Sequence, residues 1–140
     1  MPGMTHTRLR KFNQTAMRYY DKQRLANDMC MVVIADRHVF VRGQTGHALD
    51  DSTRIALGDA AAQADQAMRN VATLLADAGA TLADVVKVTV WVTDRDYRVP
   101  VLNAIGRHLK GVHAAYTDVI IKGLATPELL MEVDVDAVLP

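Results

Sequence analysis

QADQAMRNVATLLADAGATLADVVKVTVWVTD, residues 63–94, decides the fold because its hydrophobic pattern changes period within one continuous run. From residue 59 to 78, apolar residues recur at spacings of three and four, which predicts one stripe of a helix that ends at Gly79. From Val85 to Thr93, apolar and polar residues alternate, which predicts a strand with one face in the core. We expect the valines at 86, 88, 90 and 92 on that face, and the residues at 87, 89, 91 and 93 on the other.

The flanking segments extend this pair of elements to a β-β-α-β-α-β-β order. Further strands are predicted at 31–35, 38–42, 116–122 and 130–138, with an extra one near 8–12. Asp36 and Arg37 suit a tight hairpin turn between 31–35 and 38–42, and residues 43–58 read as a loop. A second helix is predicted over 99–110, after a turn at 94–97, with Pro100 in its first turn. Two helices cover only one face of such a sheet, so we expect oligomerisation to bury the other.

Length and charge narrow the classes of function. At 140 residues the chain fits one domain, which we place at 8–140, after an unordered N-terminus at 1–7. Sixteen Lys and Arg balance sixteen Asp and Glu, so neither nucleic acid nor a membrane surface is an expected partner. The apolar runs are far shorter than the roughly 20 residues of a membrane-spanning helix. A single cysteine, Cys30, and the lack of an apolar signal segment favour a cytoplasmic protein.

Three segments carry a family resemblance: Val41-Arg42-Gly43-Gln44, the stretch 63–94, and the ending GLATPELLMEVDVDAV at 123–138. Over about residues 30–138 they resemble the Rid family of reactive intermediate deaminases, also called YjgF-like or endoribonuclease L-PSP-like. The resemblance implies a chorismate-mutase-like α+β fold, with a mixed sheet and two helices on one face. It implies a homotrimer with clefts at the subunit interfaces. It also implies hydrolysis of enamines and imines to 2-keto acids and ammonia, with no metal and no organic cofactor.

The resemblance assigns roles to residues that match the family positions. Glu132 matches a glutamate that positions water or moves protons, and is the expected catalytic residue. Gly43 with Gln44, and Asn103 on the second predicted helix, match positions that bind the substrate. Without the resemblance, the alternation of acidic and apolar residues at 131–136 indicates only a strand with one solvated or interface face.

The family arginine that holds the substrate carboxylate is missing. Its segment reads Ala114-Ala115-Tyr116-Thr117 here, so Tyr116 stands at that position, or Thr117 after a one-residue shift. A phenol offers one neutral donor where a guanidinium offers two charge-assisted hydrogen bonds, which are worth roughly 1.5–3 kcal/mol. We therefore expect weak binding of ordinary 2-imino acids. The family also has a tyrosine before the hairpin, and neither Met29 nor Cys30 matches it.

Arg42 is the first candidate for a substitute cation, because it precedes Gly43 at the expected site. The alternative is a solvated or ion-paired arginine. Lys122 and His113 are weaker candidates for the same task. Cys30 lies in an apolar run and reads as a packing residue, and the five histidines lack the paired spacing of a metal site.

Two hypotheses of function follow. The first is a deaminase-like hydrolase that acts on a reactive enamine or imine with an atypical choice of substrate. The second is a non-enzymatic trimer that binds a small metabolite or acts as a regulatory or chaperone-like protein. An open polar cleft in which Glu132 faces Arg42 would favour the enzyme, and a cleft filled by Tyr116 would favour the second hypothesis.

Overall fold

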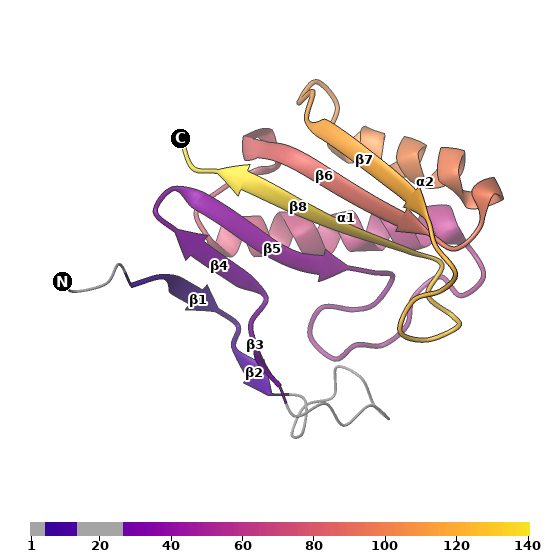
Figure 1. The fold of residues 1–140 in the computed structure, drawn as a ribbon, viewed down its shortest axis with the longest axis horizontal. Coiled ribbons are helices and arrows are strands. Elements are labelled where there is room, and N and C mark those ends of the chain that lie inside the picture. The colour runs from indigo at the N-terminus through magenta and orange to yellow at the C-terminus, as the bar shows by residue number, and fades with distance from the viewer. Residues whose placement is uncertain (1–4, 14–26) are drawn as a thin grey trace.

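The computed structural model describes residues 5–13 and 27–140, and within them the chain forms one six-stranded sheet and two long helices (Figure 1). The elements occur in the predicted β-β-α-β-α-β-β order from residue 32 onward. The strands are β1 (Thr7–Leu9), β2 (Phe12–Asn13), β3 (Asp28–Met29), β4 (Val32–Ala35), β5 (His38–Gln44), β6 (Val85–Val92), β7 (Ala115–Ile120) and β8 (Met131–Val138). The helices are α1 (Ala60–Asp77) and α2 (Arg95–His108), with a single 3-10 turn, η2 (Leu82–Asp84), between α1 and β6.

The sheet is mixed, as predicted. Its strand order is β1-β4-β5-β8-β6-β7, so the last strand of the chain lies between β5 and β6 at the centre. Every neighbouring pair is antiparallel except β6 and β7, which are parallel and are joined through α2. β2 and β3 form a separate two-stranded ribbon. β1 and β7 are therefore the two edges of the sheet.

Helix α1 forms where the apolar stripe predicts it. The Asp59 carboxylate caps the first turn by accepting a hydrogen bond from the Ala62 amide at 3.0 Å. Beyond the last turn, Gly79 takes a φ of +81°, a left-handed conformation that favours glycine. The apolar side chains of the stripe are buried against the sheet, namely those of Ala60, Ala64, Ala67, Met68, Val71, Leu74 and Leu75. Each fully buried Leu or Met contributes about 1.5–3 kcal/mol to stability.

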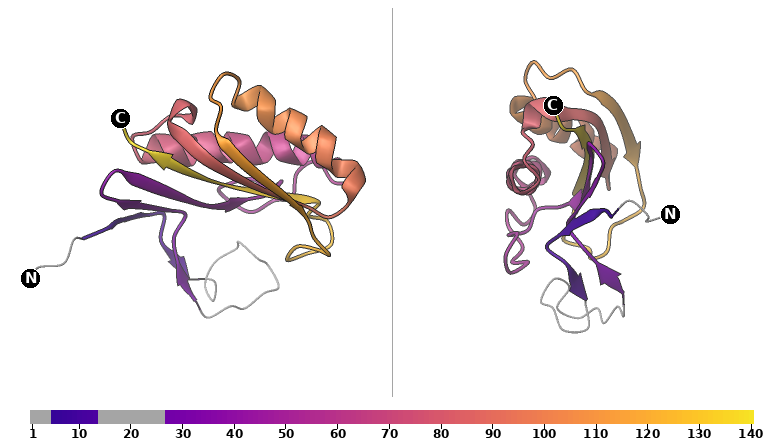
Figure 2. Two further views of the ribbon diagram at one scale, coloured as in Figure 1. Left: turned by 45° about the horizontal axis from the view of Figure 1, so that its top comes forward. Right: turned by 90° about the vertical axis from the view of Figure 1, so that its left-hand side faces the viewer.

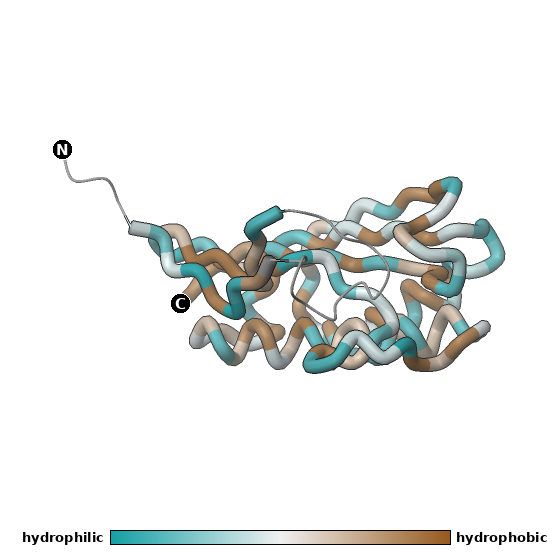
Figure 3. Tube along the Cα trace, turned by 90° about the horizontal axis from the view of Figure 1, so that it is seen from below, coloured by the Kyte–Doolittle hydropathy of each residue, from teal (hydrophilic) through white to brown (hydrophobic). Residues whose placement is uncertain are grey.

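Both helices lie on the same side of the sheet (Figures 2 and 3). This confirms the predicted layer arrangement and leaves one face without helices, which we call the open face. Burial along β8 shows the division: Met131, Val133, Val135 and Ala137 are fully buried toward the helices, while Glu132, Asp134 and Asp136 are half-buried on the open face. The open face thus carries a row of acids within a single chain.

Strand β6 departs from the predicted alternation at its start. Val88, Val90 and Val92 are buried as expected, but Val86 is 48 % exposed and Val85 is buried instead. The register between β6 and β8 shifts between Val85 and Lys87, which is a β-bulge. A bulge adds one residue to one strand, so the side chains before it exchange faces.

Helix α2 begins earlier than predicted. The predicted turn at 94–97 is wrong, because Asp94 caps a helix that starts at Arg95, with its carboxylate accepting from the Asp96 amide at 2.8 Å. Pro100 consequently lies in the second turn rather than the first, and cannot donate the helical hydrogen bond to the Asp96 carbonyl. The first turn is polar, so the apolar period that indicates a helix starts only at Val99.

The β4–β5 hairpin is confirmed, with Asp36 at a φ of 57° in its turn. The predicted loop at 43–58 begins too early, since β5 continues through Gly43 to Gln44 with a bulge after Val41. The extra strand expected near 8–12 is present as β1, paired with β4. Residues 1–4, within the expected unordered N-terminus, lie outside the described residues. In the described parts of the chain, neither helix is long and apolar enough to cross a membrane.

Candidate functional site

Glu132 lies directly over Gly43. Gln44 pairs with Val133 across β5 and β8, and the bulge before Gln44 places Gly43 beneath the Glu132 side chain. A Cβ added at Gly43 would lie 2.3 Å from Glu132 Oε2 and 2.9 Å from its Cδ, so only glycine leaves room for the carboxylate in this position. The structure therefore brings together two of the residues expected from the family resemblance.

The surroundings of Glu132 favour a proton on its carboxylate. Burial raises the pKa of Glu132 above its ordinary value, the nearby Arg42 guanidinium lowers it in part, and the Asp134 carboxylate raises it further. The neighbouring strand β6 places Trp91 directly opposite Glu132, as a large neighbour on the open face. A carboxyl group whose pKa moves toward neutral pH is suited to accept and return a proton.

Arg42 lies close enough to Glu132 for its charge to lower the pKa of that carboxyl group. The Arg42 guanidinium carbon lies 5.5 Å from the centroid of the Phe12 ring, a cation–π distance. Its charge also helps to keep His47 unprotonated. Arg42 is thus a cation that stands between the N-terminal strands and the Glu132 carboxylate.

Gln44 has a structural role within this chain. Its side chain is fully buried, and Nε2 donates a hydrogen bond to the Arg42 carbonyl at 2.9 Å. Its Oε1 is buried and has no hydrogen-bond partner among the described residues. In this pair, Gly43 therefore leaves room for the Glu132 carboxylate, and Gln44 contributes a buried side-chain amide.

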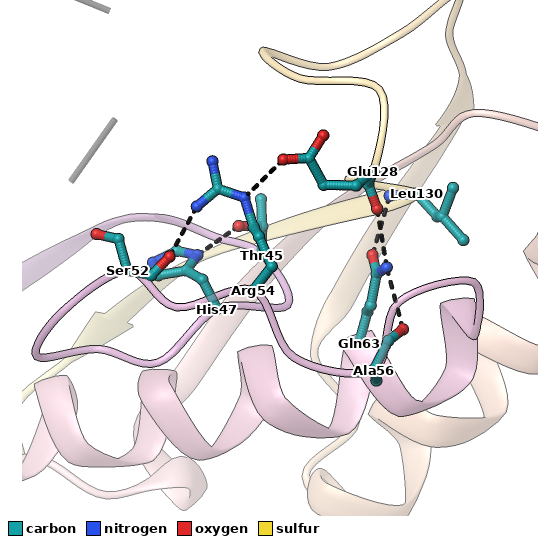
Figure 4. A network of polar contacts seen from close by, with 8 residues as sticks. All are labelled: Thr45, His47, Ser52, Arg54, Ala56, Gln63, Glu128 and Leu130. Carbon is teal, nitrogen blue, oxygen red and sulfur yellow. Dashed lines mark hydrogen bonds and ion pairs between the residues drawn. The ribbon is translucent and has the colours of Figure 1, made fainter. Parts of the chain in front are cut away.

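The loop after β5 holds a buried histidine that sequence reasoning missed (Figure 4). His47 Nδ1 and Thr45 Oγ1 lie 2.5 Å apart and share a hydrogen bond, and both side chains are buried. Burial, with the positive charges of Arg54 and Arg42, lowers the pKa of His47 from 6.5 to about 4. His47 is therefore neutral at pH 7. The sequence holds no signal for this cluster, because the loop has no periodicity.

Two side chains tie this loop to the segment that leads into β8 (Figure 4). Arg54 Nε contacts Glu128 Oε1 at 3.2 Å, and Arg54 Nη1 donates to the Ser52 carbonyl at 2.9 Å. Gln63, at the start of α1, donates to the Glu128 carbonyl at 3.0 Å and accepts from the Leu130 amide at 2.9 Å. These bonds fix the chain two residues before Glu132.

Tyr116 and Thr117 point to opposite faces of β7. In the parallel register, Tyr116 lies opposite Val88, which is buried toward the helices, and Thr117 lies opposite Thr89 on the open face. Thr117 Oγ1 accepts a hydrogen bond from Lys87 Nζ at 2.6 Å. Tyr116 is 41 % exposed at the sheet edge, and partial burial raises the pKa of its phenol. The phenol is therefore a neutral hydrogen-bond donor.

Asn103 lies exposed on α2. One turn before it, Arg98 reaches across to β7 and forms an ion pair with Asp118, which sequence reasoning also missed. Asp118 lies opposite Val90 and so shares its face of β7 with Tyr116. A second group of polar residues therefore collects at the edge between β7 and α2.

The two groups cannot meet inside one chain. Glu132 is on the open face of β8, whereas Tyr116 is on the helix-covered side of β7, and β6 lies between these strands. The remaining candidates from the sequence lie elsewhere. His113 sits in the turn before β7 with a φ of 56°, Lys122 lines a cavity of about 460 Å³ after β7, and the Cys30 thiol donates to the Val32 carbonyl at 3.4 Å.

Among the described side chains, no three His, Cys, Asp or Glu groups come together as metal ligands. Among curated protein sequences, none matches the chain. Solved structures do resemble it. A member of the YjgF/YER057c/UK114 family from Mycobacterium tuberculosis has 26% identity and a TM-score of 0.75, over 96% of this chain and 100% of that one.

Two further structures show the same fold. Yeast Mmf1 has 22% identity and a TM-score of 0.77, over 97% of this chain and 100% of that one. RidA from an Antarctic Psychrobacter has 20% identity and a TM-score of 0.75, over 94% and 100% of the two chains. The mixed sheet with two helices on one face is thus the chorismate-mutase-like fold of these proteins. The family described as Endoribonuclease L-PSP matches residues 21–139, and the chain belongs to this family, whose members include the YjgF and Rid proteins.

Proposed function

We propose that the protein hydrolyses the C=N bond of a reactive enamine or imine and releases a carbonyl compound and ammonia. The observation that carries this proposal is the Glu132 carboxylate, which lies over Gly43 on the open face beside the positive charge of Arg42. Burial raises the pKa of Glu132, so the group can hold a proton closer to neutral pH than an exposed glutamate can. No other described carboxylate lies over a glycine in this way.

The reaction needs one water molecule and an exchange of protons. An enamine first takes a proton at carbon and becomes an iminium ion. Water then adds to the carbon of the C=N bond while Glu132 accepts a proton from it, and Glu132 returns that proton to nitrogen as the C–N bond breaks. Ammonia leaves and takes up the remaining hydroxyl proton as ammonium, and the oxygen of water remains as the carbonyl oxygen. General acid–base groups in such steps supply roughly 10²–10⁴ in rate.

We propose that catalysis takes place in clefts of a homotrimer. The Glu132 group and the Tyr116 group lie on opposite faces of the sheet, so a neighbouring subunit is needed to bring them to one ligand. The open face also presents apolar surface in the single chain, because Phe40 is 45 % exposed and Val119 is 40 % exposed. Association would cover these side chains. Light scattering should then give three times the chain mass, and a stable monomer would contradict the proposal.

The tyrosine at position 116 favours a second candidate, a trimer that binds a small metabolite without converting it. An enzyme that processes ordinary 2-imino acids needs a strong carboxylate contact, and the neutral Tyr116 phenol does not supply one. The family description names a ribonuclease, but a chain with zero net charge has no general attraction for RNA, so we propose small-molecule chemistry.

A coupled assay separates the two candidates. A pyridoxal-phosphate dehydratase generates 2-aminoacrylate or 2-iminobutyrate, and the release of keto acid is followed with the wild type and with Glu132→Gln. We expect the wild type to accelerate release and Glu132→Gln to lose roughly 10²-fold or more of that acceleration. Asp136→Asn is the matched control, because Asp136 lies on the same face of β8, away from Gly43.

Each result has a defined meaning. Equal rates for the wild type and Glu132→Gln would remove Glu132 from the chemistry. A wild type without any acceleration, for either substrate, would favour the binding candidate. Light scattering on both variants keeps a loss of assembly distinct from a loss of catalysis.

A further inference from the structure

Arg98 projects from α2 over the edge strand of the sheet. Its guanidinium contacts the Asp118 carboxylate along one side, through Nε to Oδ2 and through Nη2 to Oδ1, the second at 3.3 Å. Both partners lie in regular elements, α2 and β7, and the ion pair directs the guanidinium toward β7. The Asp118 hydrogen bond raises the pKa of Arg98, which keeps the group cationic.

The guanidinium lies beside the position where the family arginine is missing. Tyr116 and Asp118 are two residues apart on β7 and point to the same side, opposite Val88 and Val90. Successive residues on one face of a strand are about 6.5–7 Å apart. Arg98, held above Asp118, therefore stands one such step along the strand from Tyr116.

One side of the guanidinium is open. Arginine carries five N–H donors in a planar fork, and Asp118 uses the Nε and Nη2 side. Nη1 has no hydrogen-bond partner within residues 5–13 and 27–140, and the Arg98 side chain is 48 % exposed. The Tyr116 hydroxyl likewise has no partner in the described chain, and it is a neutral donor. Two unpaired donors thus lie at the same exposed edge.

We propose that Arg98, oriented by Asp118, binds the carboxylate of the ligand at the β7–α2 edge, with the Tyr116 hydroxyl as a second donor. This inference rests on the proposed function for the identity of the cleft, and its new element is the residue that holds the carboxylate. The carboxylate contact comes from the helix, whereas the family arginine would come from the strand.

The ion pair does not block this role. An arginine fork can serve one carboxylate along each of two sides, and the first partner holds it in place for the second. Asp118 reduces the net charge at the edge, so we expect the contact to be weaker than that of an unpaired arginine and to weaken as salt is added. An exposed ion pair that serves only as a strap between α2 and β7 is the structural alternative.

Arg107 provides a matched control on the same helix. It also pairs with an aspartate, Asp65, at 3.5 Å, but that partner belongs to α1 rather than to β7. Arg107→Gln and Arg98→Gln therefore each remove one arginine from an exposed helical ion pair. Only Arg98→Gln removes a donor beside Tyr116.

The experiment measures binding of 2-oxobutyrate, the keto-acid product, by NMR titration of the full chain, with 2-oxobutyramide as the uncharged analogue. We expect Arg98→Gln to weaken 2-oxobutyrate binding about tenfold or more, which is the loss of one charge-assisted contact, and to leave the amide analogue unchanged. Arg98→Lys should keep part of the affinity, and Arg107→Gln should match the wild type. Equal affinity of Arg98→Gln and wild type for 2-oxobutyrate, or no binding by the wild type, would overturn the proposal.

The coupled assay separates this proposal from the proposed function. If the wild type turns over 2-iminobutyrate and Arg98→Gln has the same KM, the hydrolase stands and the Arg98 contact is wrong. If no turnover occurs but 2-oxobutyrate binding depends on Arg98, the contact stands and the hydrolase is wrong. A purely structural strap would lower the thermal midpoint of Arg98→Gln and leave the affinity of the folded protein unchanged.

Discussion

The two groups of candidate residues differ in how the fold constrains them. At the β5–β8 centre, the Glu132 carboxylate is fitted against Gly43, and the segment before it is tied to α1 by the buried Gln63. At the β7–α2 edge, Tyr116 and Arg98 are both about half exposed. A substitution at the centre must satisfy several neighbours at once, whereas one at the edge meets mainly solvent.

Under the proposed function, this difference explains how the chain can keep Glu132 for proton transfer while Tyr116 stands at the edge. Replacement of an arginine by Tyr116 at an exposed strand edge needs no repacking of the core. The choice of ligand can therefore change at the edge without any change at the centre. Substitutions in each region test whether the two regions are separable in this way.

The largest effect is expected from Gly43→Ala on activity. The new Cβ would lie 2.3 Å from Glu132 Oε2, so the end of the glutamate side chain must move away. The rate in the coupled assay should then fall to the level of Glu132→Gln, a loss of roughly 10²-fold or more. Because a flexible side chain can yield, the denaturation midpoint should change little.

Gly106→Ala is the control for this change. Gly106 lies in α2, and nothing stands within 4 Å of the Cβ that alanine would add. Alanine favours a helix over glycine by about 0.5–1 kcal/mol, so this variant should be more stable and fully active. Full activity of Gly43→Ala would show that Glu132 does not need its position over residue 43.

The next largest effect is expected on stability at low pH, where His47 becomes protonated. Because burial and two arginines lower its pKa from 6.5 to about 4, protonation favours the unfolded chain. The free energy of unfolding therefore keeps its full value above pH 6.5. It decreases as the pH falls from 6.5 through 4, by about 3 kcal/mol in all. Urea denaturation of the wild type and His47→Gln at pH 7, 5 and 4 should show this loss only in the wild type. The raised pKa values of Glu132 and Asp134 act in the opposite sense in both proteins and cancel in the comparison.

A smaller effect on stability is expected from Gly46→Ala. Its Cβ would lie 2.5 Å from Gln63 Cγ and 3.0 Å from Gln63 Cα, so it would meet the helix backbone rather than a movable side-chain end. Overpacking of this kind costs about 1–3 kcal/mol, measurable by urea denaturation. Gly43→Ala and Gly46→Ala should therefore separate, with activity lost in the first and stability lost in the second. Equal stability of the two variants would contradict this distinction.

Periodicity was sufficient for the regular part of the fold. The stripe from Ala60 to Leu75 and the alternation from Val88 to Val92 both appear in the structure as predicted. The start of α2 was missed because its first turn is polar and capped by Asp94, and the bulge after Val85 was missed because a bulge leaves the composition of a strand unchanged. These errors are confined to element ends, where a few hydrogen bonds decide the structure.

The candidate site depended more on resemblance than on pattern. Gly43 and Glu132 are far apart in the chain, and only the pairing of β5 with β8 places one over the other. The Arg98–Asp118 pair could not be predicted, since an arginine on a helix surface has the same pattern as any solvated charge. His47 gave no signal either, because its burial follows from the fold of an irregular loop.

The smallest effect is expected from Tyr116→Phe, which removes only the hydroxyl at the open edge. Within the described residues that hydroxyl has no hydrogen-bond partner, so its loss should leave the free energy of unfolding unchanged within about 0.5 kcal/mol. If it donates to the ligand carboxylate, 2-oxobutyrate affinity should fall about two- to tenfold, the range for one neutral hydrogen bond, as measured by the same NMR titration. A loss of stability above about 1 kcal/mol would mean instead that the tyrosine is packed inside the assembled protein. The edge would then be as constrained as the centre, and the ligand contact would have to be sought at Arg42.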